Sequence, residues 1–227
     1  MEVTLLHYTP DPELAVATAA RICYSSWDGK KLHSELTSEE INNLIDIIIK
    51  NKHFSTLEHA VFTFSISGVS RACTHQIVRH RLASYNQQSQ RYVKFNENTL
   101  NVVIPNSITN DSEALKVFNE AIDSCKTAYI KLLNSDIPAE DARYVLPNAC
   151  ESNLIVTMNA RELIHFFSLR CCNRSQWEIR ELAWKMLTIV TEIAPRLFMC
   201  AGPACLTSGI CSEGKMTCGN PYSKVKN

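Results

Sequence analysis

Strict alternation of apolar and polar residues over residues 60–67 is the feature that most constrains the fold. Phe62, Phe64 and Ile66 point to one side of an extended chain, while the residues between them are polar. This pattern predicts a half-buried strand, which Gly68 is expected to end. Part of the core must therefore lie on one face of a sheet.

Helical patterns occur before and after this strand. Thr37 and Glu40 form a capping box ahead of an apolar face, and Asn159 and Glu162 form a second one. Helices are predicted over residues 11–23, 37–48, 70–80, 111–133, 138–143, 159–169 and 175–193, and further strands over 2–8 and 153–158. Residues 81–92 show no consistent apolar stripe and predict no regular element.

The irregular mixture of strands and helices argues against a strictly alternating parallel sheet. We expect an α+β fold with one domain over residues 1–200, built on a mixed or antiparallel twisted sheet flanked by helices, and a cysteine-containing tail over residues 201–227. The sequence has no G-x-G-x-x-G fingerprint, so no Rossmann unit is expected.

Composition excludes several classes of function. The 23 basic and 23 acidic side chains balance, which gives no bulk attraction to nucleic acid or to an anionic membrane. No apolar run approaches the ~20 residues of a membrane span, and the amino terminus lacks the pattern of a signal peptide. We therefore expect a cytoplasmic protein whose ten cysteines are reduced thiols.

Residues 79–92 concentrate hydrogen-bond donors. They hold three Arg, one His, two Ser, one Asn and three Gln, and no acidic residue. Guanidiniums this close together repel one another unless an anion lies among them, and Arg binds phosphate in a bidentate manner. The segment suits a nucleotide, although a solvated basic loop paired with distant acids, or a nucleic-acid patch, would also account for it.

The same segment carries a family resemblance. Arg79-His80-Arg81 followed by Ser84, Asn86, Ser89 and Arg91 fits R-H-R-x2-S-x-N-x2-S-x-R, the signature of the flavin-dependent thymidylate synthases, which this chain resembles. Further blocks follow the family order: His53-x-Ser55-x-x-Glu58-His59, Ala142-Arg143-x-Val145-Leu146-Pro147, Asn159-Ala160-Arg161, and Leu169-Arg170 before Gln176-Trp177-Glu178.

The resemblance implies two sets of ligand-binding residues in a homotetramer with sites shared between subunits, Ser55 coming from a neighbouring subunit. The FAD set is Ser55, Arg79, His80, Arg81, Gln87, Asn159, Arg161 and His165. The dUMP set is Gln76, Arg79, Gln87, Gln88, Ser89, Gln90, Arg91, Arg143 and Arg170. Gln87 and His165 depart from the family, where an acid and an Asn are common, but both can form hydrogen bonds. Arg161 and His165 are expected on one helical face.

The resemblance also implies a reaction. The carbon of methylenetetrahydrofolate would reach C5 of dUMP, with FAD as redox cofactor and NADPH as reductant. Arg170 is the predicted catalytic residue, because a guanidinium beside uracil N3 stabilises the anion that develops there. His53 is a candidate for folate binding or methylene transfer. The alternatives are a nucleotide- or RNA-binding module without catalysis, and a flavin- and folate-dependent RNA uracil methylase.

Four cysteines close the sequence. Cys200, Cys205, Cys211 and Cys218 follow the spacing C-x4-C-x5-C-x6-C. Four thiolates would suit a tetrahedral Zn²⁺ ion, but the paired C-x2-C arrangement is absent. Free thiols, and a disulfide, are the alternatives to a metal site.

Overall fold

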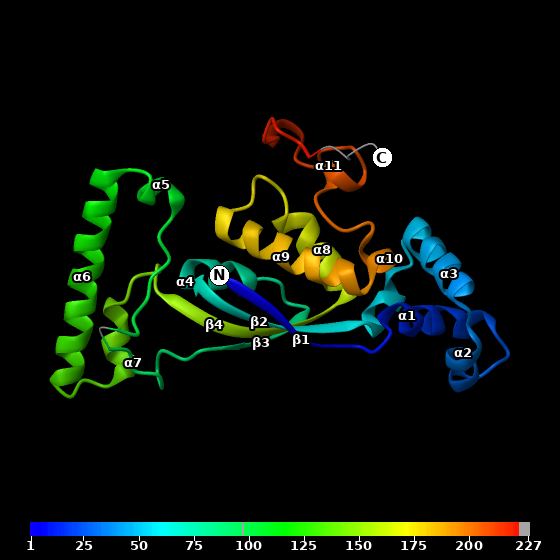
Figure 1. Ribbon diagram of the computed structural model, residues 1–227, viewed down its shortest axis with the longest axis horizontal. Helices are drawn as coiled ribbons and strands as arrows, with labels where there is room; N and C mark the ends of the chain where they lie inside the picture. Colours follow the sequence, from blue (N-terminus) through cyan, green and yellow to red (C-terminus); the bar gives the residue numbers. More distant parts are fainter. Residues whose placement is uncertain (97, 223–227) are drawn as a thin grey trace. The chain divides into compact units, whose positions relative to one another are not determined.

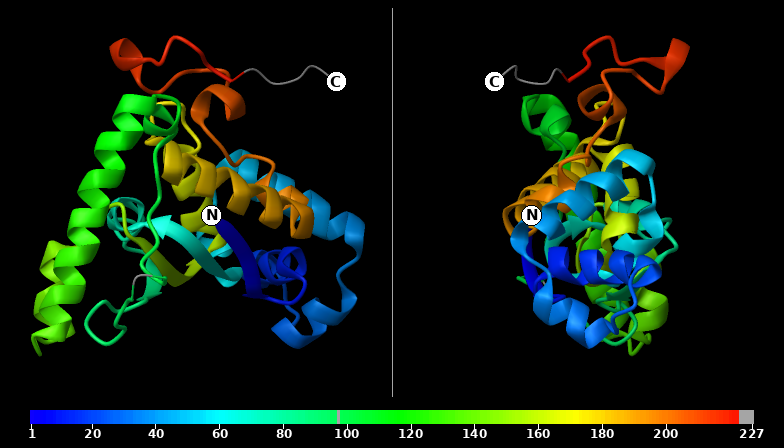
Figure 2. Two further views of the ribbon diagram at one scale, coloured as in Figure 1. Left: turned by 60° about the vertical axis from the view of Figure 1, so that its left-hand side comes forward. Right: turned by 90° about the vertical axis from the view of Figure 1, so that its right-hand side faces the viewer.

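One open sheet runs through the protein. The computed structural model describes residues 1–96 and 98–222 and is drawn in Figure 1 and, turned, in Figure 2. The sheet has the strand order β1-β2-β4-β3, is antiparallel and is flanked by helices, which confirms the expected α+β class. Its strands are β1 (Glu2–Tyr8), β2 (Val61–Ser70), β3 (Ala83–Gln87) and β4 (Glu151–Asn159).

Strand β2 follows the alternation in the sequence. Phe62, Phe64 and Ile66 are fully buried, and the residues between them are half-buried. The prediction that Gly68 ends the strand is wrong, because β2 continues to Ser70. Gly68 has a φ of 66°, which glycine adopts without the penalty of a Cβ, and an added Cβ would lie 3.3 Å from the Met1 nitrogen. The glycine therefore bends the strand and does not stop it.

Strand β3 contradicts the prediction that residues 81–92 form no regular element. Ala83, Tyr85 and Gln87 are half-buried and alternate with exposed Ser84 and Asn86. The inward positions hold a methyl group, a phenol and an amide. The period of two is therefore present in burial but absent from hydrophobicity, which is the property that sequence patterns report.

The contacts of the chain gather in two units. The first comprises residues 1–2, 66–79 and 86–155. Its cluster of buried residues consists of Leu100, Tyr129, Ala142 and Cys150. Its helices are α4 (Arg71–Ile77), α5 (Asn106–Thr109), α6 (Ser112–Asn134) and α7 (Ala139–Ala142), with a 3₁₀ turn η3 (Arg143–Val145).

The second unit comprises residues 3–65, 80–85 and 156–227. Phe198 packs edge-on against Phe62 and Phe167 in its core, with ring centroids 5.5 and 6.2 Å apart. Its helices are α1 (Pro12–Arg21), α2 (Gly29–Glu35), α3 (Ser38–Asn51), α8 (Ala160–Arg170), α9 (Trp177–Ile193), α10 (Pro195–Phe198) and α11 (Ala204–Thr207), with 3₁₀ turns η1 (Ile22–Tyr24), η2 (Phe54–His59) and η4 (Gly214–Met216). Helices α8 and α9 lie side by side (Figure 1).

Helix starts were predicted well where a cap marks them. The capping box of Thr37 and Glu40 is present at the start of α3. At α8, Asn159 Oδ1 accepts a hydrogen bond of 2.9 Å from the backbone N–H of Glu162, but the Glu162 carboxylate lies against another side chain, described below. The short elements α2, η2, α5 and α10 were not predicted, because one or two turns give too little periodicity.

The described part of the tail, residues 201–222, packs against the rest of the second unit. Asn173, in the connection between α8 and α9, donates to the backbone oxygen of Asn220 at 2.8 Å and accepts from Tyr222 Oη at 2.7 Å. The Tyr222 ring lies edge-on to Trp184, with centroids 5.3 Å apart. The tail is thus tied to the segment that directly follows α8.

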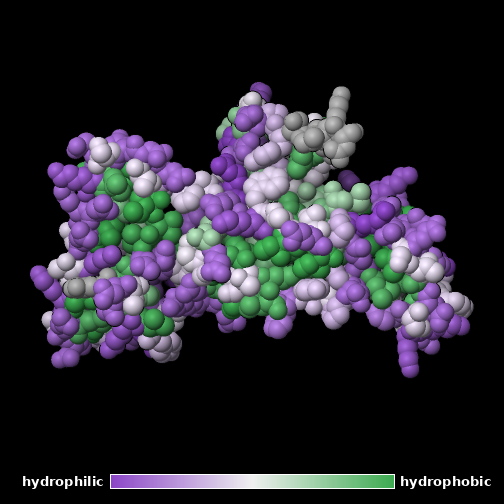
Figure 3. Space-filling model, viewed as in Figure 1, coloured by the Kyte–Doolittle hydropathy of each residue, from purple (hydrophilic) through white to green (hydrophobic). Residues whose placement is uncertain are grey.

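Two surface properties bear on function. Among the described residues, no helix combines the length and apolarity that crossing a bilayer requires. On the face drawn in Figure 3, apolar residues reach the surface in both units. Val117 and Tyr144 are 66% and 83% exposed in the first unit, and Leu82 and Met199 are 70% and 62% exposed in the second.

Candidate active site

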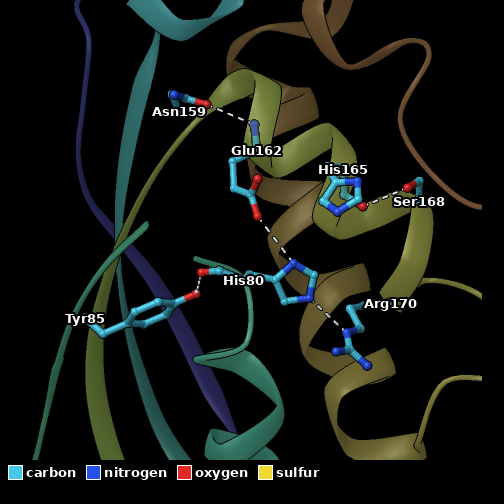
Figure 4. A network of polar contacts seen from close by, with 7 residues as sticks. All are labelled: His80, Tyr85, Asn159, Glu162, His165, Ser168 and Arg170. Carbon is cyan, nitrogen blue, oxygen red and sulfur yellow. Dashed lines mark hydrogen bonds and ion pairs between the residues drawn. The ribbon is translucent and has the colours of Figure 1, made fainter. Parts of the chain in front are cut away.

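A buried histidine lies at the centre of a polar cluster in the second unit. His80 is only 5% exposed, and its ring packs edge-on against Phe166 with centroids 4.9 Å apart. Tyr85 Oη donates a hydrogen bond of 2.8 Å to the His80 backbone oxygen. Figure 4 shows the imidazole between Glu162 and Arg170, which come from the two ends of α8. Ring and backbone are therefore both fixed.

The two ring nitrogens of His80 have different partners. Arg170 Nε donates to Nε2 at 3.0 Å, while Nδ1 lies 3.4 Å from Glu162 Oε1. A guanidinium only donates, so Nε2 must be the acceptor and carry no hydrogen. The hydrogen of the neutral ring then resides on Nδ1, the nitrogen that lies 3.4 Å from Glu162 Oε1.

Burial makes the neutral form of His80 the stable one. Desolvation, helped by the charges of Arg170 and His165, lowers the pKa of His80 to about 4. Burial also raises the pKa of Glu162, which is 4% exposed. At neutral pH the neutral imidazole of His80 thus lies between the Arg170 guanidinium cation and the Glu162 carboxyl group.

Helix α8 explains how these groups meet. Glu162, Phe166 and Arg170 recur every four residues and so share one helical face, which the structure turns towards His80 (Figure 4). Arg161 and His165 are both exposed on α8, as their spacing predicts. The His165 ring still lies edge-on to His80, with centroids 6.0 Å apart. His80, His165 and Arg170, all predicted site residues, are therefore brought together.

Other predicted residues of this unit lie on or beside the 3₁₀ turn η2. His53 precedes this turn, Ser55 lies within it, and both are exposed. Glu58 of the same turn pairs with Arg161 of α8 at 2.6 Å, and about half of each side chain is exposed. Arg161 therefore has a carboxylate partner within the protein, in a pair that water reaches.

In the first unit, Gln87 is held by two buried hydroxyls. Its Nε2 donates to Thr74 Oγ1 at 3.0 Å and to Ser152 Oγ at 2.9 Å. Gln88 is held against β4, because its backbone N–H donates to the Asn153 oxygen at 2.8 Å and its Oε1 accepts from Asn153 Nδ2 at 3.2 Å. Gln88, Ser152 and Asn153 belong to the lining of a pocket of about 320 Å³.

Residues 89–91, which follow Gln88, form fewer hydrogen bonds within the protein. Ser89 Oγ accepts a hydrogen bond of 3.1 Å from the Arg91 backbone N–H. Gln90 Nε2 is buried and has no hydrogen-bond partner among residues 1–96 and 98–222. Arg91 forms an ion pair with Glu140, and about half of each of these side chains is exposed. A buried donor without a partner is uncommon, and its usual explanation is a missing ligand or water.

Guanidiniums also gather around Arg143. Its Nε donates to the Glu140 backbone oxygen at 3.1 Å. Burial, and after it the charge of Arg143, lowers the pKa of Arg71. Arg71 was not singled out from the sequence, because a lone Arg at the start of a short helix carries no motif.

Arg79 and Arg81 differ from the arginines above. Both are exposed, and within residues 1–96 and 98–222 neither forms an ion pair with a carboxylate. Gln76, one turn before Arg79, donates to the Ala72 backbone oxygen at 3.4 Å. The two arginines are thus available to an anion without displacing an acidic partner.

The tail cysteines show no metal-binding arrangement. In the part of the chain that the structure describes, no group of three or more His, Cys, Asp or Glu side chains is placed to hold a metal ion. Cys200, Cys205, Cys211 and Cys218 are all free thiols. The zinc alternative for the tail gains no support from this geometry.

Comparison with known proteins identifies the family. The family model described as "Thymidylate synthase complementing protein" matches residues 4–196. A flavin-dependent thymidylate synthase of Geobacter sulfurreducens is 54% identical over 219 residues, which cover 96% of this chain and 94% of the relative. Proteins of the same name from Clostridium tetani and Saccharolobus solfataricus are 45% and 47% identical and cover 100% and 91% of this chain, and 96% and 78% of their own lengths. The chain belongs to the thymidylate synthase complementing protein family.

Proposed function

We propose that the protein is a flavin-dependent thymidylate synthase. It converts dUMP to dTMP with methylenetetrahydrofolate as carbon donor, FAD as redox cofactor and NADPH as reductant. The family match over residues 4–196 and the 54% identity to a relative of that name support this function. Within the chain, the observation that carries it is Arg170, held through its Nε by a buried neutral histidine.

The donor set of the chain fits FAD. Arg79 and Arg81 are exposed cations that pair with no acidic side chain of the described residues, which suits the pyrophosphate of a dinucleotide. Exposed His165 and Ser55 can reach a ligand directly, and Arg161 can do so by releasing Glu58. His80 and Asn159 contribute indirectly, because their side chains are committed within the protein. The bound flavin supplies the transfer of reducing equivalents from NADPH.

Arg170 acts on the uracil ring in this proposal. Its charge stabilises the negative charge that develops at N3 and the adjacent carbonyl, which raises electron density at C5. C5 then becomes nucleophilic without a covalent bond to the enzyme, so no cysteine nucleophile is required. Anchoring at Nε limits rotation of the guanidinium and so reduces the entropy lost on reaching the reactive geometry.

The remaining dUMP residues bind the rest of the nucleotide. Ser89, Arg91 and Arg143 hold the phosphate, and Gln90 uses its unpartnered Nε2 as a donor to the ligand. Gln76, Gln87 and Gln88 complete the set from the same unit. His53 assists the folate. The chemistry of this set, cations and amides with little acidic character, matches a nucleoside monophosphate.

The assembly and the division of the chain extend the proposal. A homotetramer with sites shared between subunits, with Ser55 reaching a neighbour's FAD, would cover the exposed apolar residues of both units, such as Val117 and Met199. Residues 1–200 form the catalytic domain and residues 201–227 an accessory tail. The ten free cysteines accord with a cytoplasmic enzyme.

Tritium release from [5-³H]dUMP tests the function. We expect purified protein to be yellow and to release tritium and form dTMP when methylenetetrahydrofolate and NADPH are both present. Omission of either co-substrate should stop the reaction. A colourless protein that releases no tritium after addition of FAD would refute the proposal.

A further inference from the structure

Glu162 has a buried carboxyl group and does not belong to the residues predicted to bind FAD or dUMP. It is 4% exposed, on the same face of α8 as Arg170. Burying a carboxyl group costs free energy unless a hydrogen bond or a charge compensates for it. Its carboxylate does not complete the capping box predicted at the start of α8, because it lies 3.4 Å from His80 Nδ1. Its place in the fold therefore needs another explanation.

Glu162, His80 and Arg170 form a directed chain. The carboxylate can only accept from Nδ1–H, and the guanidinium can only donate to Nε2. Each contact therefore requires the same tautomer of His80 (Figure 4). If the ring hydrogen moved to Nε2, it would oppose Arg170 Nε–H, and Nδ1 would face the carboxylate with a lone pair. Both contacts would be lost together.

The surroundings of the ring leave it little freedom to avoid this choice. The Phe166 ring, on α8 between Glu162 and Arg170, packs edge-on against the His80 ring with centroids 4.9 Å apart. Tyr85 Oη donates a hydrogen bond of 2.8 Å to the backbone oxygen of His80. Both neighbours fix the plane and the depth of the imidazole. Because the His80 ring cannot rotate or shift to compensate, a change of tautomer must move the Arg170 side chain.

We propose that Glu162 and His80 are positioning residues, which orient the Arg170 guanidinium for the uracil ring by holding His80 as its Nδ1–H tautomer. This inference rests on the proposed function, because it assigns the aim of Arg170 to a reaction on dUMP. The arrangement is a carboxylate–histidine pair in which the histidine orients a cationic side chain. A second group that fixes a tautomer controls activity through geometry, without touching substrate.

The titratable groups around the ring agree with this assignment. Arg170, Glu162 and His165 lie beside the imidazole, and Tyr85 bonds its backbone. Burial and the charge of Arg170 disfavour the imidazolium, so the pKa of His80 falls to about 4. The lone pair of His80 Nε2 therefore remains available to accept from Arg170 at neutral pH, whereas protonation of the imidazole would remove it.

Two substitutions of Glu162 separate the tautomer from mere packing. Glu162→Leu fills the same buried space but accepts no hydrogen bond, whereas Glu162→Gln keeps an acceptor oxygen for Nδ1–H. We expect kcat for dTMP formation to fall about 100-fold in Glu162→Leu and less than tenfold in Glu162→Gln, by analogy with lost orienting partners elsewhere. The KM for dUMP and the Kd for FAD should change less than about threefold in both.

Leu163→Ala is the matched control. Leu163 is the next residue of α8, is fully buried and lies outside the chain of contacts. The Leu163→Ala substitution should lower Tm as much as Glu162→Leu, since core truncations of this kind cost about 2–5 kcal/mol. It should nevertheless leave kcat within twofold of the wild-type value. A folded Glu162→Leu enzyme with wild-type kcat would overturn the inference, and so would equal losses in Glu162→Leu and Glu162→Gln.

A spectroscopic measurement decides the case independently of activity. In ¹⁵N-histidine-labelled wild-type protein, His80 should show a protonated Nδ1 and an unprotonated Nε2, and Glu162→Gln should keep this pattern. If Glu162→Leu does not fold, the wild-type spectrum still decides, because an Nε2–H tautomer of His80 would refute the inference. Absence of dTMP formation by wild type, in contrast, refutes the proposed function and leaves the tautomer measurement standing.

Discussion

Two polar regions of the molecule are built in opposite ways. The α8 network, defined as Glu162, His80 and Arg170, is largely buried, and both ring nitrogens of its histidine have partners. The β3 segment, defined as Gln87 at the end of strand β3 and residues 88–91 directly after it, is half-buried or exposed. It holds Gln90 Nε2, which has no partner among the described residues, and ends in the exposed pair of Arg91 with Glu140.

This difference suggests a division of labour. A closed, buried network resists rearrangement and can hold one side chain in a reactive geometry. Exposed ion pairs contribute only about 0–1 kcal/mol, so Arg91 of the β3 segment can exchange Glu140 for a ligand at little cost. We therefore expect changes in the α8 network to act mainly on kcat and stability, and changes in the β3 segment to act mainly on affinity.

The largest effect is expected at the end of the α8 network. Arg170→Ala should lower dTMP formation by a factor of about 10³ or more, since it removes the charge that stabilises the uracil anion. FAD should remain bound, because Arg79 and Arg81 keep their exposed guanidiniums. Tritium release measures the first result and flavin absorbance the second. Turnover near that of wild type in this variant would refute the catalytic assignment.

Acid should destabilise the α8 network more than the rest of the fold. The pKa of His80 is lowered from 6.5 to about 4, so the unfolded chain binds the proton more readily, and stability falls as pH drops from about 6.5 to 4. His80→Gln keeps an acceptor for Arg170 but does not titrate. Wild type should lose about 2 kcal/mol more than this variant between pH 7 and 5.

Denaturant unfolding at several pH values measures that difference. Because carboxylates elsewhere respond to acid equally in both proteins, only the wild-type excess reports His80. Parallel pH curves for wild type and His80→Gln would show that the histidine is not buried in its neutral form, and would remove the basis for the division of labour.

In the β3 segment, Ser89→Ala should raise the KM for dUMP about tenfold, the value of one hydrogen bond to a charged group. The kcat should change less than about threefold, because the proposed site uses this hydroxyl to hold the phosphate and not in the chemical step. Steady-state kinetics with varied dUMP test this. Complete loss of turnover with unchanged dUMP affinity would instead indicate a nucleophilic serine.

How much the sequence predicts differs between the same two regions. Caps and apolar alternation act within a few residues, so α3, α8 and β2 were predicted from local patterns. The contact of Arg170 with His80 spans 90 residues of chain, and no local pattern encodes it. Glu162 was interpreted as a capping residue because the N-cap motif explains it locally, although its carboxylate serves a distant partner.

The residues proposed to bind ligands were predicted for another reason. Arg79, Arg81 and Gln90 belong to a segment, residues 79–92, in which cations and hydrogen-bond donors accumulate without any acidic residue. What the sequence could not supply is which of these donors already have partners. Gln87 and Gln90 look alike in sequence. In the part of the chain that the structure describes, however, the first makes two hydrogen bonds through Nε2 and the second makes none.

That contrast gives the smallest and sharpest prediction. Gln90→Leu removes a buried donor that has no partner, so the unliganded protein should become more stable by about 1 kcal/mol. The same change should raise the KM for dUMP about threefold to fivefold, because the ligand loses a hydrogen bond of roughly 0.5–1.5 kcal/mol. Thermal unfolding without ligand and steady-state kinetics provide the two measurements.

Gln87→Leu is the matched comparison, since it makes the same chemical change three residues earlier. It removes the hydrogen bond that Gln87 gives to the buried Ser152 hydroxyl and one of two hydrogen bonds at Thr74 Oγ1, which still donates to the Arg71 backbone oxygen. It should therefore lower Tm where Gln90→Leu raises it. Opposite signs of ΔTm at the two positions would show that the β3 segment contains one donor kept for structure and one kept for a ligand. Destabilisation by both substitutions would mean that Gln90 also serves the fold, and dUMP would then need another donor.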